Sequence, residues 1–504
     1  MRHVVFSPQM DTGPTDIPAP GPKGRSLARA VLGGTALLTI AGIVTRMFGL
    51  ASSPILTRLV GPAPYGVVAL AGTISSLATT VALLGVDLAY FRFFFIGGDS
   101  GRSVERFCWR FSLSMGLGFS LVAGAGWWLI SPSSLYSGLA PVVAAGTLVA
   151  LIVTMSTTRR RIHGDYPRIA AATVAGGAVG VVVSVFLAWR WRADAQAMLV
   201  GALIGSLATV AILGIPPVSS LLRPSGLGPA KRKELLLMGI AGAVTAPMYW
   251  VIASADRWFL GAWAGAGSLG IYSFASTIGL IGMMVNSALT LAWFPEVSRE
   301  YEASPGGSPA AIGRMWARLA ALLMVTWLAV AASGGDLIRL FADRRFHEGA
   351  AFVPWIAGGV FFNGMASLAN TGLLLSRNLV PTAWCWTAGA AANLALNALL
   401  VGPFGAMGAS LASFLSYALI AAGMVRAAQC RLYLPIPWGK LAGAAALAIG
   451  AGALMSFPWS ASPAWSLMMK LPAGAAAAAA MGAIAAPDWM RSFARGDLFR
   501  REAP

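Results

Sequence analysis

The chain has 504 residues, of which 57% are hydrophobic and 11% are charged, and its mean hydropathy is +0.72. Because a soluble domain carries about 25% charged residues, this composition excludes a water-soluble globular protein and favours one embedded in a lipid bilayer. The net charge of +18 could indicate a nucleic-acid partner. Basic residues also gather on the inner side of membrane proteins, however, and the distribution described below favours that explanation.

Residues 1–26 contain five prolines and no apolar run, which predicts a disordered cytoplasmic tail. Fourteen apolar windows of roughly 20 residues follow, the length that a helix needs to cross the bilayer core. They are centred near residues 40, 76, 118, 149, 179, 205, 247, 281, 324, 363, 391, 415, 448 and 476. Continuous apolar runs without alternation favour helices over a β-barrel. The sequence therefore predicts an all-α polytopic membrane protein with about fourteen transmembrane helices.

Three landmarks of the first half return in the same order in the second half. They are Arg58 ahead of Gly66 and Arg257 ahead of Gly270, TTRRRIHGDYP at 157 and LLSRNLVP at 374, and AMLVGALIGS at 197 and AMGASLASF at 406. An even number of helices per copy keeps both copies in one orientation, so we expect two pseudo-symmetric six-helix bundles. The expected boundaries are a bundle at 27–215, a cytoplasmic linker at 216–236, a second bundle at 237–426, two extra transmembrane helices at 427–490 and a basic cytoplasmic tail at 491–504.

The basic residues predict the orientation. With both termini in the cytoplasm, 27 of the 36 Lys and Arg residues fall in cytoplasmic segments and nine in external loops or helix interiors. This distribution accounts for the charge without a nucleic-acid partner. Three cysteines and three histidines are scattered without metal or disulfide spacing, so we expect neither a metal site nor another cofactor.

Three arginines are candidates for binding an anionic substrate. Arg46 lies inside the first apolar window, where an arginine costs roughly 2.5 to 3.5 kcal/mol on insertion scales. Such an arginine either faces a cavity or packs between helices and extends its charge to the interface. Arg58 and Arg257 lie nearer the external interface. There they either line the rim that a departing anion passes or stabilise helix ends, with Asp256 as a partner for Arg257.

Polar side chains within the apolar windows form a second candidate set. Asn393 and Asn397 are four residues apart and Asn363 and Asn370 are seven apart, so each pair shares a helix face. Asn286 stands alone in the eighth window. A carboxamide can bind sugar hydroxyls, and hydrogen bonding between helices explains the same placement equally well. Tyr249 follows Pro247 by two residues, and we expect it to line a cavity at a broken helix.

Three motifs carry a resemblance to a known family. They are TRMFGLASSPILTRLVGPAPYG in the first window, ADRWFLG followed by GIYS in the seventh, and ALTLAWFPEVSREY in the eighth. Over residues 27–440 the chain resembles the polysaccharide-transporter branch of the multidrug, oligosaccharidyl-lipid and polysaccharide exporter superfamily, which includes Wzx-type O-antigen flippases.

The resemblance implies two bundles around a central cavity and alternating access in the bacterial inner membrane. The implied cargo is an undecaprenyl-diphosphate-linked oligosaccharide, moved from the cytoplasmic to the periplasmic leaflet for O-antigen, capsule or exopolysaccharide synthesis. Related lipid II flippases also have an arginine at the position of Arg46. Their further cavity arginine is replaced here by Ser52, which argues against lipid II as cargo.

Two other functions remain as alternatives. A cation-coupled multidrug exporter of the same superfamily would need buried acids, whereas we expect Asp87 and Asp256 at helix ends and Asp336 in a solvated loop. A membrane glycosyltransferase or polysaccharide polymerase would need acidic residues or large external loops, and the first external loop has no carboxylate. We therefore expect a transporter that is not an enzyme. Partnership with a polymerase or glycosyltransferase through the basic inner loops is compatible with transport.

Overall fold

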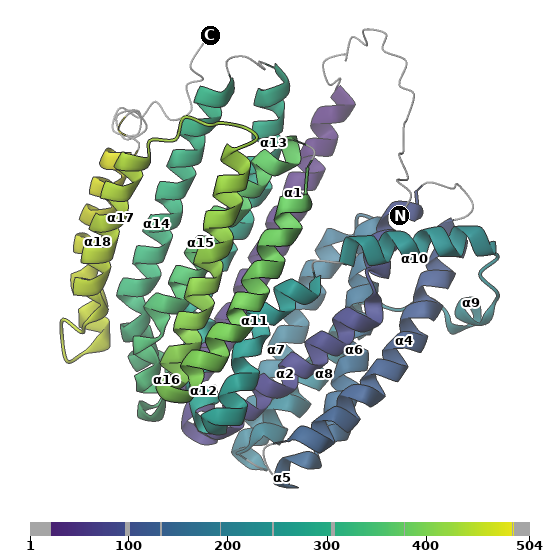
Figure 1. Ribbon diagram of the computed structural model, residues 1–504. Coiled ribbons are helices and arrows are strands. Elements are labelled where there is room, and N and C mark those ends of the chain that lie inside the picture. Colours follow the sequence, from purple (N-terminus) through teal and green to yellow (C-terminus); the bar gives the residue numbers. More distant parts are fainter. Residues whose placement is uncertain are drawn as a thin grey trace.

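The computed structural model describes residues 22–95, 101–131, 134–191, 193–243, 246–303, 308–376, 378–485 and 487. Every regular element within these ranges is a helix, as Figure 1 shows. The expected tail at 491–504, and the expected tail at 1–26 up to residue 21, lie outside the described residues.

The helices of the first half form one group, called here the front lobe. They are α1 (Pro22–Val60), α2 (Pro62–Leu83), α3 (Val86–Phe93), α4 (Gly101–Ile130), α5 (Ser134–Ser137), α6 (Ala140–Ile162), α7 (Tyr166–Arg190) and α8 (Ala195–Leu213). Helices α7 and α8 pack along each other, and α1 packs on α7. Two short elements, α9 (Val218–Leu222) and α10 (Pro229–Ala243), lead out of this lobe.

The remaining helices form the rear lobe. They are α11 (Ala246–Trp263), α12 (Gly265–Gly279), α13 (Gly282–Ala303), α14 (Ser308–Phe341), the 3-10 helix η2 (Arg344–Ala351), α15 (Val353–Leu375), α16 (Val380–Gln429), α17 (Trp438–Ser456) and α18 (Pro463–Ala485). Helices α11, α13 and α14 pack around α15 and α16, and α17 and α18 pack on α14. Figure 1 shows the two lobes side by side.

Ten of the described helices are long and apolar enough to cross a membrane, and two bent pairs raise the number to twelve. One of the ten, α16, has 50 residues, about 75 Å of helix against a bilayer core of about 30 Å. The helix is interrupted at Gly405, which has a φ of +53°. The two parts lie close together beside this break, because a side chain at Gly408 would overlap the carbonyl oxygen of Leu400. The helix therefore makes two crossings. These features confirm the expected class, a polytopic α-helical membrane protein.

The seventh expected span, centred near 247, is short and preceded by a separate helix. Helix α10 packs on α3 of the front lobe, where Gly239 lies against the Leu84 and Gly85 carbonyl groups. Helix α11 begins at Ala246, so Pro247 occupies the first turn, a position at which its missing N–H costs nothing. Pro54, by contrast, lies within the continuous helix α1.

The two ends of the bundle differ in charge. At one end, called the basic end, α4 and α14 begin and α6 ends in Arg159, Arg160 and Arg161. At the opposite end lie the α1–α2 turn at Gly61 and the helix η2. Here α2 crosses α12, so the two lobes are in contact at the end opposite the basic end.

Candidate functional site

An open cleft of about 520 Å³ lies between α13 and α15. Its lining is neutral: Met283, Asn286, Ser287, Thr290, Phe294 and Pro295 from α13, and Asn363, Ser367, Asn370, Thr371 and Leu374 from α15. The cleft falls in the size range of about 300 to 1,000 Å³ typical of small-molecule sites. Three candidates from the sequence, Asn286, Asn363 and Asn370, are thus brought together by the fold.

Helical periodicity explains why these side chains share a surface. On α15, Asn363, Ser367, Asn370 and Leu374 follow one another at intervals of three and four residues, which places them along one stripe of the helix. Since α15 runs from the opposite end toward the basic end, and Asn363 lies at its middle, the cleft extends from mid-span toward the basic end.

The carboxamides of the cleft differ in their bonding. Asn286 Nδ2 donates to the Val360 carbonyl oxygen at 2.7 Å and thereby ties α13 to α15. Asn370 Oδ1 accepts from Thr382 Oγ1 at 2.8 Å. The Asn363 carboxamide has no hydrogen-bond partner among the described residues, although this residue is 7% exposed. A polar group held in this way is available to a ligand.

Asn393 and Asn397 lie elsewhere. Both are fully buried in the first half of α16, and Asn397 Nδ2 donates to the Asn393 carbonyl oxygen at 2.8 Å and to its Oδ1 at 3.1 Å. Asn393 Nδ2 and Asn397 Oδ1 have no partner in the described part of the chain. The fold therefore does not bring this pair into the cleft.

The cationic candidates are dispersed. Arg46 is exposed on α1 and has no partner among the described side chains, while its neighbour Thr45 packs on Gly177 of α7. Arg58 is also exposed. Arg257 is half-buried, and its Nη1 donates to the Ala253 carbonyl oxygen at 2.6 Å and lies 3.4 Å from Asp256 Oδ1.

Tyr249, the aromatic candidate, is 44% exposed on α11. Its ring lies 5.8 Å from that of Trp386 on α16. It does not line the α13–α15 cleft.

Two acidic residues occupy positions that differ from the expectation. Asp256 lies within α11 rather than at its end and is 4% exposed, and it accepts a short hydrogen bond from the Tyr272 hydroxyl. Asp336 lies within α14 and is 1% exposed, with Lys470 Nζ of α18 at 2.6 Å. Asp256 is paired with Arg257 of its own helix and with Tyr272 of α12. The cation nearest Asp336, Lys470, comes from α18, so local sequence did not reveal that Asp336 is buried.

The contact between lobes includes two glycines at equivalent places in the repeat. A side chain at Gly66 of α2 would overlap the Ala266 carbonyl oxygen of α12, and one at Gly270 of α12 would overlap the Pro62 carbonyl oxygen of α2. The two contacts are reciprocal, with an offset of 204 residues each (270 − 66 and 266 − 62). Small residues at such a crossing let the two backbones touch.

A second contact between the lobes joins η2 to the end of α1. Arg345 Nη2 donates to the carbonyl oxygens of Thr57 at 3.0 Å and Arg58 at 2.9 Å, and the Asp343 N–H donates to Thr57 Oγ1 at 3.1 Å. Arg345 thus satisfies carbonyl groups that a helix end leaves open. Its guanidinium and backbone N–H bond the Asp343 carboxylate and lower the pKa of that carboxyl.

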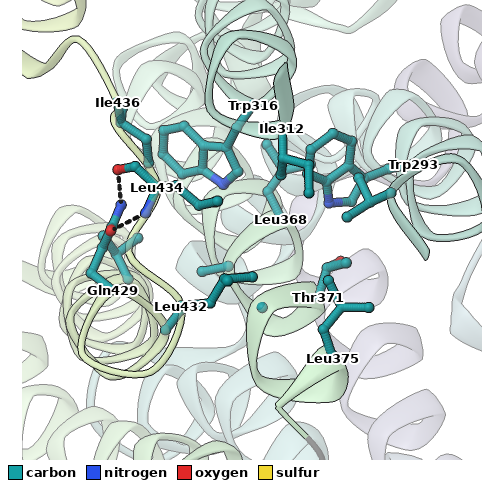
Figure 2. A pocket seen from close by; sticks show the side chains of 15 residues that line it. Trp293, Ile312, Trp316, Leu368, Thr371, Leu375, Gln429, Leu432, Leu434 and Ile436 are labelled. Atoms are coloured by element: carbon teal, nitrogen blue, oxygen red, sulfur yellow. Dashed lines mark hydrogen bonds between the residues drawn. The ribbon is translucent and has the colours of Figure 1, made fainter. Parts of the chain in front are cut away.

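A second void, which shares Thr371 with the α13–α15 cleft, is too small to be a substrate site. Figure 2 shows Trp293, Trp316 and Leu368 among the apolar side chains around it, and its volume is about 20 Å³. Its carboxamide, Gln429, is occupied by two hydrogen bonds to the backbone of Leu434. The void therefore has room for about one water molecule. Among the described residues no cluster of three His, Cys, Asp or Glu side chains could hold a metal ion.

Comparison with known proteins identifies the family. Residues 31–300 match the model of the polysaccharide biosynthesis protein family. No curated protein matches the chain.

Solved structures share the fold at low identity. The lipid II flippase MurJ in an inward closed conformation matches with a TM-score of 0.70 and 13% identity, over 90% of this chain and 100% of that chain. A multidrug resistance MATE family transporter in an inward-facing conformation matches with a TM-score of 0.58 and 12% identity, over 77% and 94%. A MOP superfamily transporter from Pyrococcus furiosus matches with a TM-score of 0.52 and 14% identity, over 80% of this chain and 95% of that chain. The chain therefore belongs to the polysaccharide biosynthesis protein family, and it shares its fold with these flippase and exporter structures.

Proposed function

We propose that this protein is a flippase that carries a lipid-linked oligosaccharide, on an undecaprenyl diphosphate carrier, from the cytoplasmic to the external leaflet. By the positive-inside rule the basic end faces the cytoplasm, and the protein lies in a bacterial inner membrane. The observation that carries the proposal is the neutral polar cleft between α13 and α15, which extends toward the basic end while the lobes meet at the opposite end. This arrangement suits a state that loads cargo from the cytoplasmic side.

The charge of the cargo supports a role for Arg46. A diphosphate cannot cross a bilayer without compensation for its lost hydration. Arg46 lies within a membrane-spanning segment, is exposed and has no partner among the described side chains. We assign it to the diphosphate. Arg58, whose side chain is also without a described partner, would contact the headgroup as it leaves.

The remaining candidates take different places in this proposal. Arg257 is engaged with Asp256 and Ala253, so we assign it to the support of α11. Asn393 and Asn397 are enclosed within the rear lobe and bond each other along α16, so we assign them no contact with the cargo. Tyr249 is exposed beside Trp386 and would line the passage between lobes.

One observation favours the drug-exporter alternative. Asp256 is a buried carboxylate within a membrane helix, the type of group that exchanges a proton or cation for cargo. It is nevertheless engaged by Arg257 and by the Tyr272 hydroxyl, so it presents no free charge to a cationic drug. We therefore retain glycolipid transport as the function, with no covalent chemistry.

The test is deletion of the gene followed by location of the lipid-linked glycans. We expect one glycolipid to accumulate in the inner leaflet, out of reach of an impermeant sugar-labelling reagent, and to become accessible when the wild-type gene is returned. Unchanged glycolipid exposure together with increased sensitivity to cationic drugs would refute the proposal in favour of the exporter.

A further inference from the structure

We infer that the α13–α15 cleft is a site for uncharged sugar units, separate from the residue that binds the diphosphate, and that Asn363 and Asn370 determine its selectivity. The inference rests on the proposed function, since it takes a lipid-linked glycan as the cargo. It adds that the charge and the sugars are recognised in different lobes.

The first argument is the chemistry of the cleft. Seven of its eleven lining residues can hydrogen-bond and none is charged: Asn286, Ser287, Thr290, Asn363, Ser367, Asn370 and Thr371. A sugar hydroxyl both donates and accepts, and so does a carboxamide. A phosphate or carboxylate in the same place would lose its hydration without gaining a cation, which is costly. The cleft therefore matches neutral sugars and disfavours anionic ones.

The second argument is the direction of the existing hydrogen bonds. The hydroxyls of Ser287, Thr290 and Ser367 each donate to a backbone carbonyl four residues earlier, so their oxygens remain able to accept. Asn363 has both its donors and its acceptor unused within the described structure, and Asn370 Nδ2 also has no described partner. The cleft thus offers acceptors from hydroxyls and donors from carboxamides.

The third argument is shape. Phe294 is 42% exposed on the wall formed by α13 and offers an aromatic surface to the apolar face of a sugar ring. The two walls are held in place by the bond from Asn286 to the Val360 carbonyl. This approach needs Gly364, because a side chain there would come within 2.9 Å of Asn286 Oδ1. The site is therefore largely formed before cargo arrives.

In this proposal the diphosphate is bound in the front lobe, away from the α13–α15 cleft. Arg46 belongs to α1, and no arginine or lysine lines the cleft. Removal of Arg46 should therefore weaken binding of the carrier with and without sugars by the same factor. Removal of Asn363 should weaken binding only when sugars are present.

The experiment compares two lipids on purified protein in nanodiscs. One is the glycolipid extracted from the deletion strain, and the other is undecaprenyl diphosphate. The dissociation constant of undecaprenyl diphosphate divided by that of the glycolipid gives the sugar contribution to affinity. Since a net hydrogen bond has a modest value, Asn363→Leu and Asn370→Leu should each lower this ratio by about 2- to 13-fold. Arg46→Ala should leave the ratio unchanged while weakening the affinity for both lipids.

Two further variants complete the design. Ser298→Ala on α13 removes a half-buried hydroxyl that bonds its own helix as the cleft hydroxyls do, but outside the cleft, and should not change the ratio. Asn363→Asp keeps the side-chain shape and removes the Nδ2 donors. It should lower the ratio as the leucine variants do and provides the test if those variants do not fold.

The outcomes distinguish the inference about the sugar site from the proposed transport of a glycolipid. An unaltered ratio in the Asn363 and Asn370 variants, or an extracted glycan made only of anionic sugars, would overturn the inference while leaving glycolipid transport intact. Failure of the wild-type protein to bind either lipid would contradict the proposed function itself, and the inference with it.

Discussion

Gly66 of α2 and Gly270 of α12 lie against each other's helix, and each would overlap a carbonyl oxygen of the partner helix if it carried a side chain. They occupy corresponding positions of the internal repeat. A pseudo-twofold axis thus relates the two halves of this contact. The contact brings the two lobes together at the end opposite the basic end. In an alternating-access cycle, this crossing must separate for cargo to leave.

The first prediction concerns that crossing. Gly66→Ala and Gly270→Ala place a methyl group against backbone, which cannot move aside as a flexible side chain can. Overpacking of this kind costs typically 1 to 3 kcal/mol, so the closed arrangement should lose roughly 5- to 150-fold in population. Distances between spin labels on α2 and α12 would show the lobes parted at this end.

The same helices supply matched controls. Gly72 on α2 and Gly267 on α12 have open space where a side chain would be added. Gly72→Ala and Gly267→Ala should behave as the wild type. Label distances that are identical in Gly66→Ala and Gly72→Ala would show that the crossing does not govern closure.

The second prediction concerns the bond between η2 and α1. Arg345→Ala removes the Nη2 group that donates to the α1 carbonyl groups of Thr57 and Arg58, and it leaves the Asp343 carboxylate with only the backbone N–H of residue 345. The lobes should open more readily at this end, which label distances between η2 and α1 would report. Arg344→Ala in the same short helix is the control. Equal label distances in both variants would show that Arg345 does not hold η2 against α1.

The third prediction is a pH dependence of that contact. The pKa of Asp343 is lowered by hydrogen bonds from Arg345, so the folded-state pKa lies below the unfolded value of about 4. The resulting stabilisation is fully present above the unfolded pKa and is lost as the pH falls through the lower folded pKa. The effect should be small, because the pair is exposed.

Asp343 also positions the Arg345 guanidinium, whose Nη2 bonds the carbonyl groups of α1, so acidification below about pH 4 should increase opening between η2 and α1 in the wild type. Asp343→Asn should remove this component of the acid response, as measured by label distances from pH 6 to pH 3. Identical acid responses in both proteins would assign the change to other groups.

The fourth prediction concerns the buried charges that attach α18. Asp336 accepts from Lys470 at 2.6 Å and from Ser466 at 2.9 Å, and Arg339 lies 3.6 Å away. Loss of one partner of a buried pair costs about 3 to 5 kcal/mol. Asp336→Asn leaves two cations without an anion, whereas Lys470→Met leaves Asp336 with Arg339. We therefore expect the larger fall in thermal stability for Asp336→Asn.

Lys440→Met on the exposed surface of α17 is the control for this series and should leave the melting temperature unchanged. A melting temperature for Asp336→Asn equal to that of Lys440→Met would mean that the cluster does not hold α18 in place.

The fifth prediction addresses Arg46. Arg46→Ala should reduce glycolipid export at least tenfold at normal protein levels, because a diphosphate would enter the bundle without a cation. Arg46→Lys should retain part of the activity, since it keeps the charge but not the planar guanidinium. Complementation of the deletion strain measures both. Full export by Arg46→Ala would remove this residue from the mechanism.

The spans and the polar stripe on α15 could be predicted from the sequence because both depend on local properties. A run of about 20 apolar residues must form its own backbone hydrogen bonds in lipid. Asn363 and Asn370 share a face because the helical period fixes their directions. The family resemblance was equally local, since it rested on short motifs.

Partners between helices depended on tertiary structure. Asn286 joins Asn363 only because α13 packs on α15, and Asp336 is neutralised by Lys470, which lies 134 residues later in the chain. The reciprocal contact of Gly66 and Gly270 likewise needs two lobes to meet. The sequence by itself determined which segments enter the membrane, since burial in lipid follows from the hydropathy of each segment. Only the packing of distant segments decided which polar groups are satisfied and which remain free to bind cargo.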